Sequence, residues 1–152
     1  YAEHILGIQD PSVGLINVGE EEGKGNILAQ ATYPLLKENN KIRFVGNIEG
    51  RDIYSDKSDV MICDGFTGNV ILKSAEAVYP LMKKRNFVDA FVNMFNWQYV
   101  GGSPILGVNG NVVIGHGSSC EVAIKNMILL SEKIAQSEIS NKIKQAFNKV
   151  NF

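Results

Sequence analysis

An acid, two glycines and an amide follow directly on an apolar run in the segment Val60–Lys73, VMICDGFTGNVILK. The backbone N–H groups that open a helix lack partners within it and attract anions, and glycine lets a ligand come close to the chain. Lys73 comes four residues after Asn69, so both side chains are expected on one face of the helix that follows. We therefore predict a site for a small anion. Its catalytic candidates are Asn69 and Lys73, and its binding candidates are Asp64, Gly65 and Gly68.

Two of these residues also have plain structural interpretations. A carboxylate beside a bound phosphate would repel it, so Asp64 is expected to accept N–H bonds from the loop or the helix rather than to carry a proton. Lys73 by itself is typical of a solvated helix residue, and only the glycine-containing segment before it suggests a catalytic role.

A second polar group, HGSS, follows the apolar run that ends near residue 115. His116 could protonate a leaving group or donate a hydrogen bond to a carbonyl oxygen, and the position equally suits a structural histidine. The next residues, Ser118 to Glu121, read S-S-C-E and have the form of a capping box, so Ser118 is expected to cap a long helix and Ser119 to be free for a ligand. The binding candidates here are Gly117, Ser118 and Ser119.

Polar residues also collect where two earlier apolar runs end. They are Asn17 and Gly19 after the first run, and Asn47, Glu49, Gly50, Arg51 and Asp52 after the second. In open α/β sheets, ligands bind beyond the carboxyl ends of the strands, so these residues are expected to share one pocket rim with the two groups above. Arg51 could bind phosphate through its guanidinium fork, or it could simply pair with Glu49 and Asp52.

The elements that must position these residues alternate between strand and helix. Strands are predicted at 13–19, 42–50 and 60–64, and helices at 24–39 and 68–85, where apolar residues recur at helical spacing. Such alternation indicates an α/β fold, doubly wound, with a mostly parallel sheet covered by helices on both faces. Asn109-Gly110 predicts a hairpin near 104–116 at a sheet edge, and the long helix after it is expected to run or bend as far as Val150.

Composition limits the possible functions. The chain has 152 residues, 45% of them hydrophobic and 20% charged, and a formal net charge of -1, which is typical of one globular domain and gives no basic surface for nucleic acid. Cys63 and Cys120 lie far apart, so neither a disulfide framework nor a metal site is predicted, and reduced thiols favour the cytoplasm. The opening segment YAEHILGI resembles the tail of a helix, so further chain is expected before it.

Several known motifs are absent. No G-x-G-x-x-G follows a strand, and no G-x-S-x-G is present. The segment GEEEGKGN has one residue too few between its glycines for a P-loop, and no Ser or Thr follows Lys24. No apolar run approaches the ~20 residues needed to span a bilayer.

Residues 83–99 have a different pattern. Phe87, Phe91 and Phe95 recur every four residues, Trp97 follows, and a basic run, residues 83–85, precedes them. This pattern predicts either an interfacial helix on an anionic lipid surface or a contact within the core or a dimer.

Five segments together carry a family resemblance. They are NVGEEEGKGN, FVGNIEGRD, DVMICDGFTGNVILK, YVGGSPILGVNG and HGSS. In this order the chain resembles the C-terminal half of the bacterial phosphate acyltransferases of phospholipid synthesis, the PlsX family. The resemblance implies a fold like that of isopropylmalate dehydrogenase and phosphotransacetylase, and transfer of a fatty acyl group from acyl carrier protein to inorganic phosphate, giving acyl phosphate. It also implies a homodimer attached peripherally to the inner face of the cell membrane, and no cofactor is expected.

The chain departs from the family pattern in two ways. Family members are about twice as long and begin with a DAMGGD-like motif that is absent here, so this half alone is expected to be inactive. The family also has a longer excursion between Lys84 and Tyr99. Two alternatives stay open: a phosphotransacetylase-like enzyme that uses a coenzyme A thioester, and a non-catalytic half-domain that binds lipid or a partner.

Overall fold

The computed structural model describes residues 1–148 and divides into two compact units. The first unit is Tyr1–Asn69, and the second begins at Val70. Helix α2, Gly65–Lys84, contains the boundary between them.

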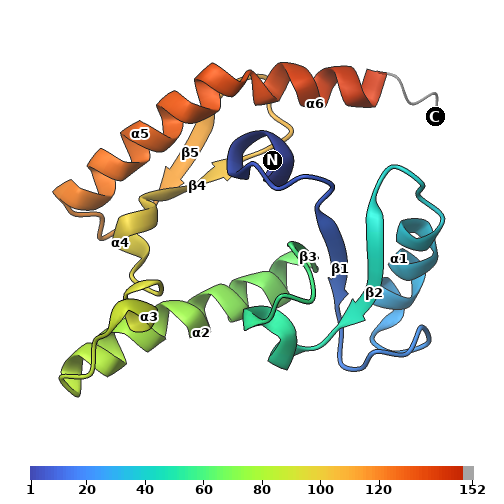
Figure 1. Ribbon diagram of the computed structural model, residues 1–152, viewed down its shortest axis with the longest axis horizontal. Helices are drawn as coiled ribbons and strands as arrows, with labels where there is room; N and C mark the ends of the chain where they lie inside the picture. The colour runs from blue at the N-terminus through green and yellow to red at the C-terminus, as the bar shows by residue number, and fades with distance from the viewer. Residues whose placement is uncertain (149–152) are drawn as a thin grey trace. The chain divides into compact units, whose positions relative to one another are not determined.

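The first unit is built on a parallel sheet of three strands (Figure 1). In chain order its elements are the π-helical turn η1 (Ala2–Leu6), β1 (Ser12–Ile16), α1 (Ile27–Lys37), β2 (Arg43–Ile48), the 3-10 turn η2 (Gly50–Tyr54) and β3 (Val60–Ile62). Strand β1 lies in the centre and pairs in parallel with β2 on one side and β3 on the other. This arrangement confirms the predicted α/β class.

The packing of the first unit explains why these segments become strands. Val13, Leu15 and Ile48 are buried, and Ile48 is fully enclosed. Gly14 is needed at the centre of β1, because a Cβ there would lie 2.9 Å from a methyl carbon of Ile48. Helix α1 packs on β2 through an edge-to-face contact between the rings of Tyr33 and Phe44, whose centroids are 5.2 Å apart.

The second unit contains a hairpin and the helices around it (Figure 1). After α2 come α3 (Ala90–Asn93), α4 (Trp97–Val100), β4 (Gly102–Ile105), β5 (Val112–Gly115), α5 (Glu121–Ser137) and α6 (Ile139–Asn148). The predicted hairpin is confirmed, since β4 and β5 pair antiparallel. Its predicted place at a sheet edge differs: within residues 1–148 these two strands form a sheet of their own. A tight turn specifies only which strand is the neighbour along the chain, and docking to a larger sheet depends on distant residues.

Helix α5 packs closely against the start of the hairpin. Gly101 has a φ of +88°, and a Cβ on it would lie 2.5 Å from the backbone nitrogen of Met127. The Asn126 side chain adds a hydrogen bond to the carbonyl of Gln98, 3.1 Å long. These contacts fix the hairpin and α4 relative to α5.

The predicted capping box at the start of this helix is wrong. Helix α5 begins at Glu121 with Cys120 in the N-cap position, and no side chain caps it. Residues 116–119 form a separate turn, in which the Ser119 N–H and hydroxyl both donate to the His116 carbonyl at 3.0 and 2.6 Å. The predicted long helix is also divided at Glu138, which has a φ of +52°, and its expected end at Val150 lies outside the described residues.

The segment 86–97, for which the spacing predicts one helix, is not a single helix in the structure. The structure has two four-residue turns there, α3 and α4, separated by residues 94–96. Asp89 caps the first turn by accepting from the Val92 N–H at 2.8 Å, and Asn96 caps the second. Asp and Asn side chains compete for backbone N–H groups, so they start new turns where the four-residue phenylalanine spacing alone predicts one helix. Among the helices of residues 1–148, none combines the length and hydropathy needed to cross a bilayer.

Candidate active site

A pocket of about 250 Å³ in the second unit brings together two of the three predicted catalytic residues. Lys73 enters it from α2, and His116 enters it from the end of β5. The other lining residues are Leu72, Glu76, Trp97, Val100, Gly101, Gly102, Ser103, Ile114 and Gly115. The pocket therefore combines a cation and an imidazole with apolar walls. The third candidate, Asn69, is the last residue of the first unit.

One carboxylate joins the two polar side chains of this pocket. Glu76 Oε2 lies 2.7 Å from Lys73 Nζ, and the same oxygen lies 3.7 Å from His116 Nε2. Sequence reasoning did not select Glu76. The signal was available, because Glu76 follows Lys73 by three residues and side chains at this spacing meet on a helix.

Trp97 has a role in the structure that the sequence interpretation did not give it. It was predicted to contact membrane or a second subunit, but its ring stacks on His116 with 4.5 Å between the centroids and 30° between the planes. Nothing in the spacing of residues 97 and 116 indicates this contact, because α4 and the end of β5 meet only in the folded chain.

The turn after β5 holds the other edge of the His116 ring. The Ser118 hydroxyl lies 2.8 Å from Nδ1, and the Ser118 backbone N–H donates to the same nitrogen at 3.2 Å. Both serines thus serve the turn around His116: Ser118 contacts its ring, and the Ser119 hydroxyl donates to its carbonyl.

The junction between β3 and α2 belongs to the first unit, and Asp64 accepts hydrogen bonds from the first turn of α2 there. The carboxylate accepts the Thr67 N–H at 2.9 Å and the Thr67 hydroxyl at 2.6 Å, as expected for an acid that caps a helix. These bonds, the hydroxyl bond first, lower the pKa of Asp64 below its usual 3.8. Burial raises the pKa of the adjacent Cys63 thiol above its usual value, and the charge of Asp64 adds to this effect. Gly68 lies close to Cys63: a Cβ on Gly68 would be 3.1 Å from the Cys63 sulfur.

Two of the predicted binding residues serve the loop after β1. Asn17 donates to the Asn47 side chain at 3.1 Å and to the Lys24 carbonyl at 3.0 Å. Asn47, which is buried, donates in turn to the Glu21 carbonyl at 2.8 Å. These amides hold the loop that contains Gly19 against the ends of β1 and β2, which places it at the carboxyl edge of the sheet as predicted.

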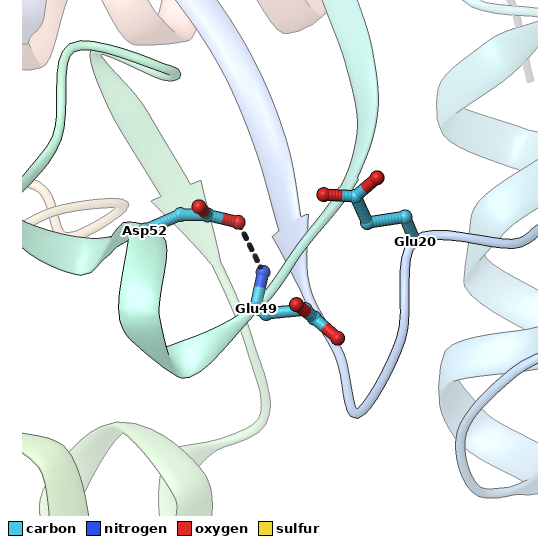
Figure 2. Close-up of side chains that lie close together, drawn as sticks. All are labelled: Glu20, Glu49 and Asp52. Atoms are coloured by element: carbon cyan, nitrogen blue, oxygen red, sulfur yellow. Dashed lines mark hydrogen bonds between the residues drawn. The ribbon is translucent and has the colours of Figure 1, made fainter.

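Acidic and basic side chains alternate beside this loop. Figure 2 shows Glu20, Glu49 and Asp52, each of which offers a carboxylate oxygen within 4.8 Å of the others, and the bond from the Glu49 N–H to Asp52. Lys57 lies 2.6 Å from Glu20 and 2.9 Å from Asp52, and Arg51 pairs with Glu49. Within the described residues these three carboxylates already have cationic partners, so we assign no metal to them.

These contacts shift two ionisable groups. The Glu49 N–H and the Lys57 ammonium lower the pKa of Asp52, and the bonds to Glu20 and Asp52 raise the pKa of Lys57. Arg51 forms an ion pair with Glu49 and lies 3.8 Å from the carboxylate of Glu20. The alternative that Arg51 pairs with its neighbours on the loop is the one that the described contacts favour.

Comparison with known proteins identifies the family. A family model described as "Fatty acid synthesis protein" matches residues 1–142 of the chain. The chain belongs to this family, the PlsX family. One curated relative, the phosphate acyltransferase of Dictyoglomus thermophilum, is 40% identical over 169 residues, which cover 99% of the chain and 50% of that protein. The phosphate acyltransferases of Halothermothrix orenii and Desulfitobacterium hafniense are 40% and 43% identical over 98% and 95% of the chain, and over 51% and 49% of their own lengths.

The chain spans about half the length of the curated PlsX-family relatives it matches. The alignment with the Dictyoglomus thermophilum protein extends over 169 positions, more than the 152 residues of the chain, so that relative has additional residues within the matched span.

Proposed function

We propose that this chain is part of a phosphate acyltransferase that transfers a fatty acyl group from acyl carrier protein to inorganic phosphate and releases acyl phosphate for phospholipid synthesis. The observation that carries the proposal is the 40% identity, over nearly the whole chain, to a protein named phosphate acyltransferase. The pocket with Lys73 and His116 supports it, because the reaction needs a positive charge for phosphate and a hydrogen-bond donor for the thioester.

The proposed reaction needs no covalent enzyme intermediate. An oxygen of phosphate attacks the thioester carbonyl carbon, and the carbonyl electron pair moves to its oxygen. When this oxyanion reforms the double bond, the carbon–sulfur bond breaks and the thiolate leaves. The thiolate takes its proton from the hydroxyl of the transferred phosphate, from water, or from a protonated His116 that regains it from that hydroxyl, so atoms and charge balance without a further reactant.

The residues have separate tasks in this proposal. Lys73 binds the phosphate through its ammonium group, and Asn69 donates to the phosphate or to the oxyanion. His116 serves the thioester, either at its carbonyl oxygen or at its leaving sulfur. Leu72, Val100 and Ile114 give the pocket apolar walls beside these groups.

The remaining binding candidates are considered within the unit to which each belongs. Gly65 and Gly68 let ligand approach the first turn of α2, although Asp64 already engages donors of that turn. Gly117 follows His116 in the second unit, and Gly50 and the loop residues described above remain binding candidates within the first unit.

The proposal also includes partners for the complete protein. Acyl carrier protein delivers the substrate, the protein forms a homodimer, and it associates from the cytoplasm with the inner face of the cell membrane. The exposed rings of Phe87 and Phe91 next to the basic run 83–85 support a contact with either anionic lipid or a second subunit.

The test uses the whole protein, incubated with inorganic phosphate and either acyl-[acyl carrier protein] or acyl coenzyme A. Hydroxylamine traps the acyl phosphate formed. We expect product mainly from the carrier-protein thioester, and none from this chain alone until the other half of the protein is added. Preference for coenzyme A would favour a phosphotransacetylase-like enzyme. Absence of product with both halves present, together with binding to liposomes, would favour a non-catalytic lipid-binding domain.

A further inference from the structure

The hydrogen bonds of His116 distinguish between the two tasks that the proposed function leaves open for it. A neutral imidazole has one nitrogen that donates and one that accepts, and the neighbours of each nitrogen show which is which. The Ser118 backbone N–H can only donate, and it is directed at Nδ1 over 3.2 Å. Nδ1 is therefore the accepting nitrogen, and the proton of the neutral ring is on Nε2.

The Nε2 side of the ring meets an acceptor. Glu76 Oε2 lies 3.7 Å from Nε2, and its negative charge favours the N–H on that nitrogen. This separation exceeds a hydrogen bond, so the Nε2 proton remains available to an oxygen of a substrate in the pocket.

Two further contacts keep the ring in this orientation. Trp97 stacks on one face of the imidazole, and the Ser118 hydroxyl lies 2.8 Å from Nδ1. Lys73, bound to Glu76 at 2.7 Å, holds the carboxylate in turn. The donating edge of His116 is thus fixed from three sides before any substrate is present.

We propose that Glu76 and the Ser118 N–H are positioning groups that hold His116 as the Nε2–H tautomer, so that His116 donates a hydrogen bond to the thioester carbonyl oxygen and does not protonate the leaving thiolate. A ring that protonated the thiolate would have to start with a proton on both nitrogens, and the Ser118 N–H opposes a proton on Nδ1. This inference rests on the proposed function, because it concerns the same thioester.

The first test compares His116→Ala with His116→Gln in the whole protein. A glutamine amide can donate to a carbonyl oxygen at nearly the same place but cannot release a proton. Removing one donor to an oxyanion costs about 100- to 1,000-fold in kcat, and this is the loss expected for His116→Ala. We expect His116→Gln to retain at least about tenfold more activity than His116→Ala, since the remaining donor is worth about one such hydrogen bond. Equal loss in both variants would overturn the proposal. The matched control is His4→Ala, which changes the other histidine of the chain.

The second test varies the leaving group. Palmitoyl thioesters of acyl carrier protein and of nitro-substituted thiophenols differ strongly in how much their thiolate needs a proton. The proposal predicts the same fold loss for His116→Ala with both thioesters, because the carbonyl oxygen is common to them. A loss that nearly disappears with the thiophenol ester would show that His116 acts on the sulfur.

The third test separates a positioning role of Glu76 from a structural one. We expect Glu76→Gln to lower kcat about tenfold, because His116 is no longer positioned. The KM for phosphate should not rise, because the substitution removes a negative charge near the bound anion. In the His116→Ala background the same change should cost less than about twofold, because the group it positions is gone. An undiminished tenfold loss in that background would overturn the positioning role. Glu132→Gln on α5 makes the same chemical change at an exposed site and is the control.

A measurement independent of activity completes the design. The whole protein, labelled with nitrogen-15 in its histidines, gives different long-range proton–nitrogen patterns for the two tautomers, and the spectrum of His116→Ala assigns the residue. The Nε2–H pattern is expected for His116, and an Nδ1–H pattern would overturn the inference even if acyl phosphate is formed. If no acyl phosphate is formed from any thioester while the Nε2–H pattern is observed, the proposed function fails and the role assigned to His116 fails with it.

Discussion

Lys73 is paired with a carboxylate and is still accessible to a ligand. Its ammonium contacts Glu76 at 2.7 Å, yet more than half of the side chain is exposed, so a phosphate can reach it from the pocket. Exposed ion pairs contribute only about 0–1 kcal/mol to stability, so the pair is not needed to keep α2 folded.

The Lys73 prediction follows from that arrangement. Lys73→Met should raise the KM for phosphate and lower kcat/KM about 100-fold, because one charge-assisted bond to the dianion is lost. Phosphate titrations of acyl phosphate formation measure the effect. Lys125→Met, an exposed lysine on α5, should change neither parameter, and an equal effect of both substitutions would contradict the assignment.

Asp64 gives a prediction about pH. Its hydrogen bonds from Thr67 lower the pKa of Asp64 in the folded protein below the usual 3.8. The ionised carboxylate therefore stabilises the fold fully above pH 3.8, and this stabilisation is lost as the pH falls through the lower pKa of the folded state. Asp64→Asn should therefore lower the Tm at pH 7, and the difference from the unchanged protein should close as the pH falls below 3.8.

Thermal unfolding monitored by circular dichroism from pH 7 to pH 2.5 or so tests this prediction within the range where such carboxylates titrate. Asp56→Asn removes an exposed carboxylate of the same unit and should show no such convergence. A Tm difference for Asp64→Asn that stays constant over the whole range would contradict the linkage.

Among the elements, α5 leaves no room for a side chain on Gly101, the residue before β4. Gly101 has positive φ and no space for a Cβ, whereas Gly107 in the hairpin turn has a similar φ of +81° with nothing within 4 Å. The two glycines therefore separate the cost of backbone strain from the cost of a steric clash.

Replacing these glycines with alanine should give unequal losses of stability. Gly107→Ala should cost about 1 kcal/mol, the strain of a left-handed alanine, and Gly101→Ala should cost at least about 2–3 kcal/mol more because α5 must move away. Urea unfolding of both variants measures the difference. Equal losses would mean that α5 and the hairpin do not approach as closely as described.

For the whole molecule, the exposed part of residues 83–99 is the segment that we propose contacts lipid or a second subunit. Phe87 and Phe91 are 58% and 59% exposed, while Phe95 is half-buried and its ring meets that of Phe91 edge to face, with ring centroids 5.4 Å apart. The structure therefore identifies Phe87 and Phe91, rather than Phe95, as the residues to test.

Phe87→Ser with Phe91→Ser in the whole protein should reduce binding to vesicles that contain phosphatidylglycerol by about tenfold or more, since two aromatic side chains contribute ~1.5–3 kcal/mol each when buried. Vesicle sedimentation measures binding, and analytical ultracentrifugation measures the oligomeric state. Leu129→Ser, at an exposed site on α5, is the control. Unchanged vesicle binding with loss of the dimer would assign the segment to the subunit contact.

The sequence by itself determined the strands, the glycine-containing junction and the family. Apolar runs ending at glycines predicted β1, β2 and β3, and Asn109-Gly110 predicted the hairpin, because these signals act between neighbouring residues. Asp64 was correctly expected to accept N–H bonds for the same reason: a cap lies within three residues of the group it binds.

Only the tertiary structure decided which distant side chains meet. Glu76 joins Lys73 to His116, Trp97 stacks on His116, and Asn17 bonds Asn47 across two strands. The structure also corrected the capping box and the long phenylalanine helix, where backbone N–H groups had a choice between partners. Local pattern fixes secondary structure when one hydrogen-bonding arrangement is clearly favoured, but a pocket depends on the packing of segments far apart in the chain, and no spacing in the sequence encodes that packing.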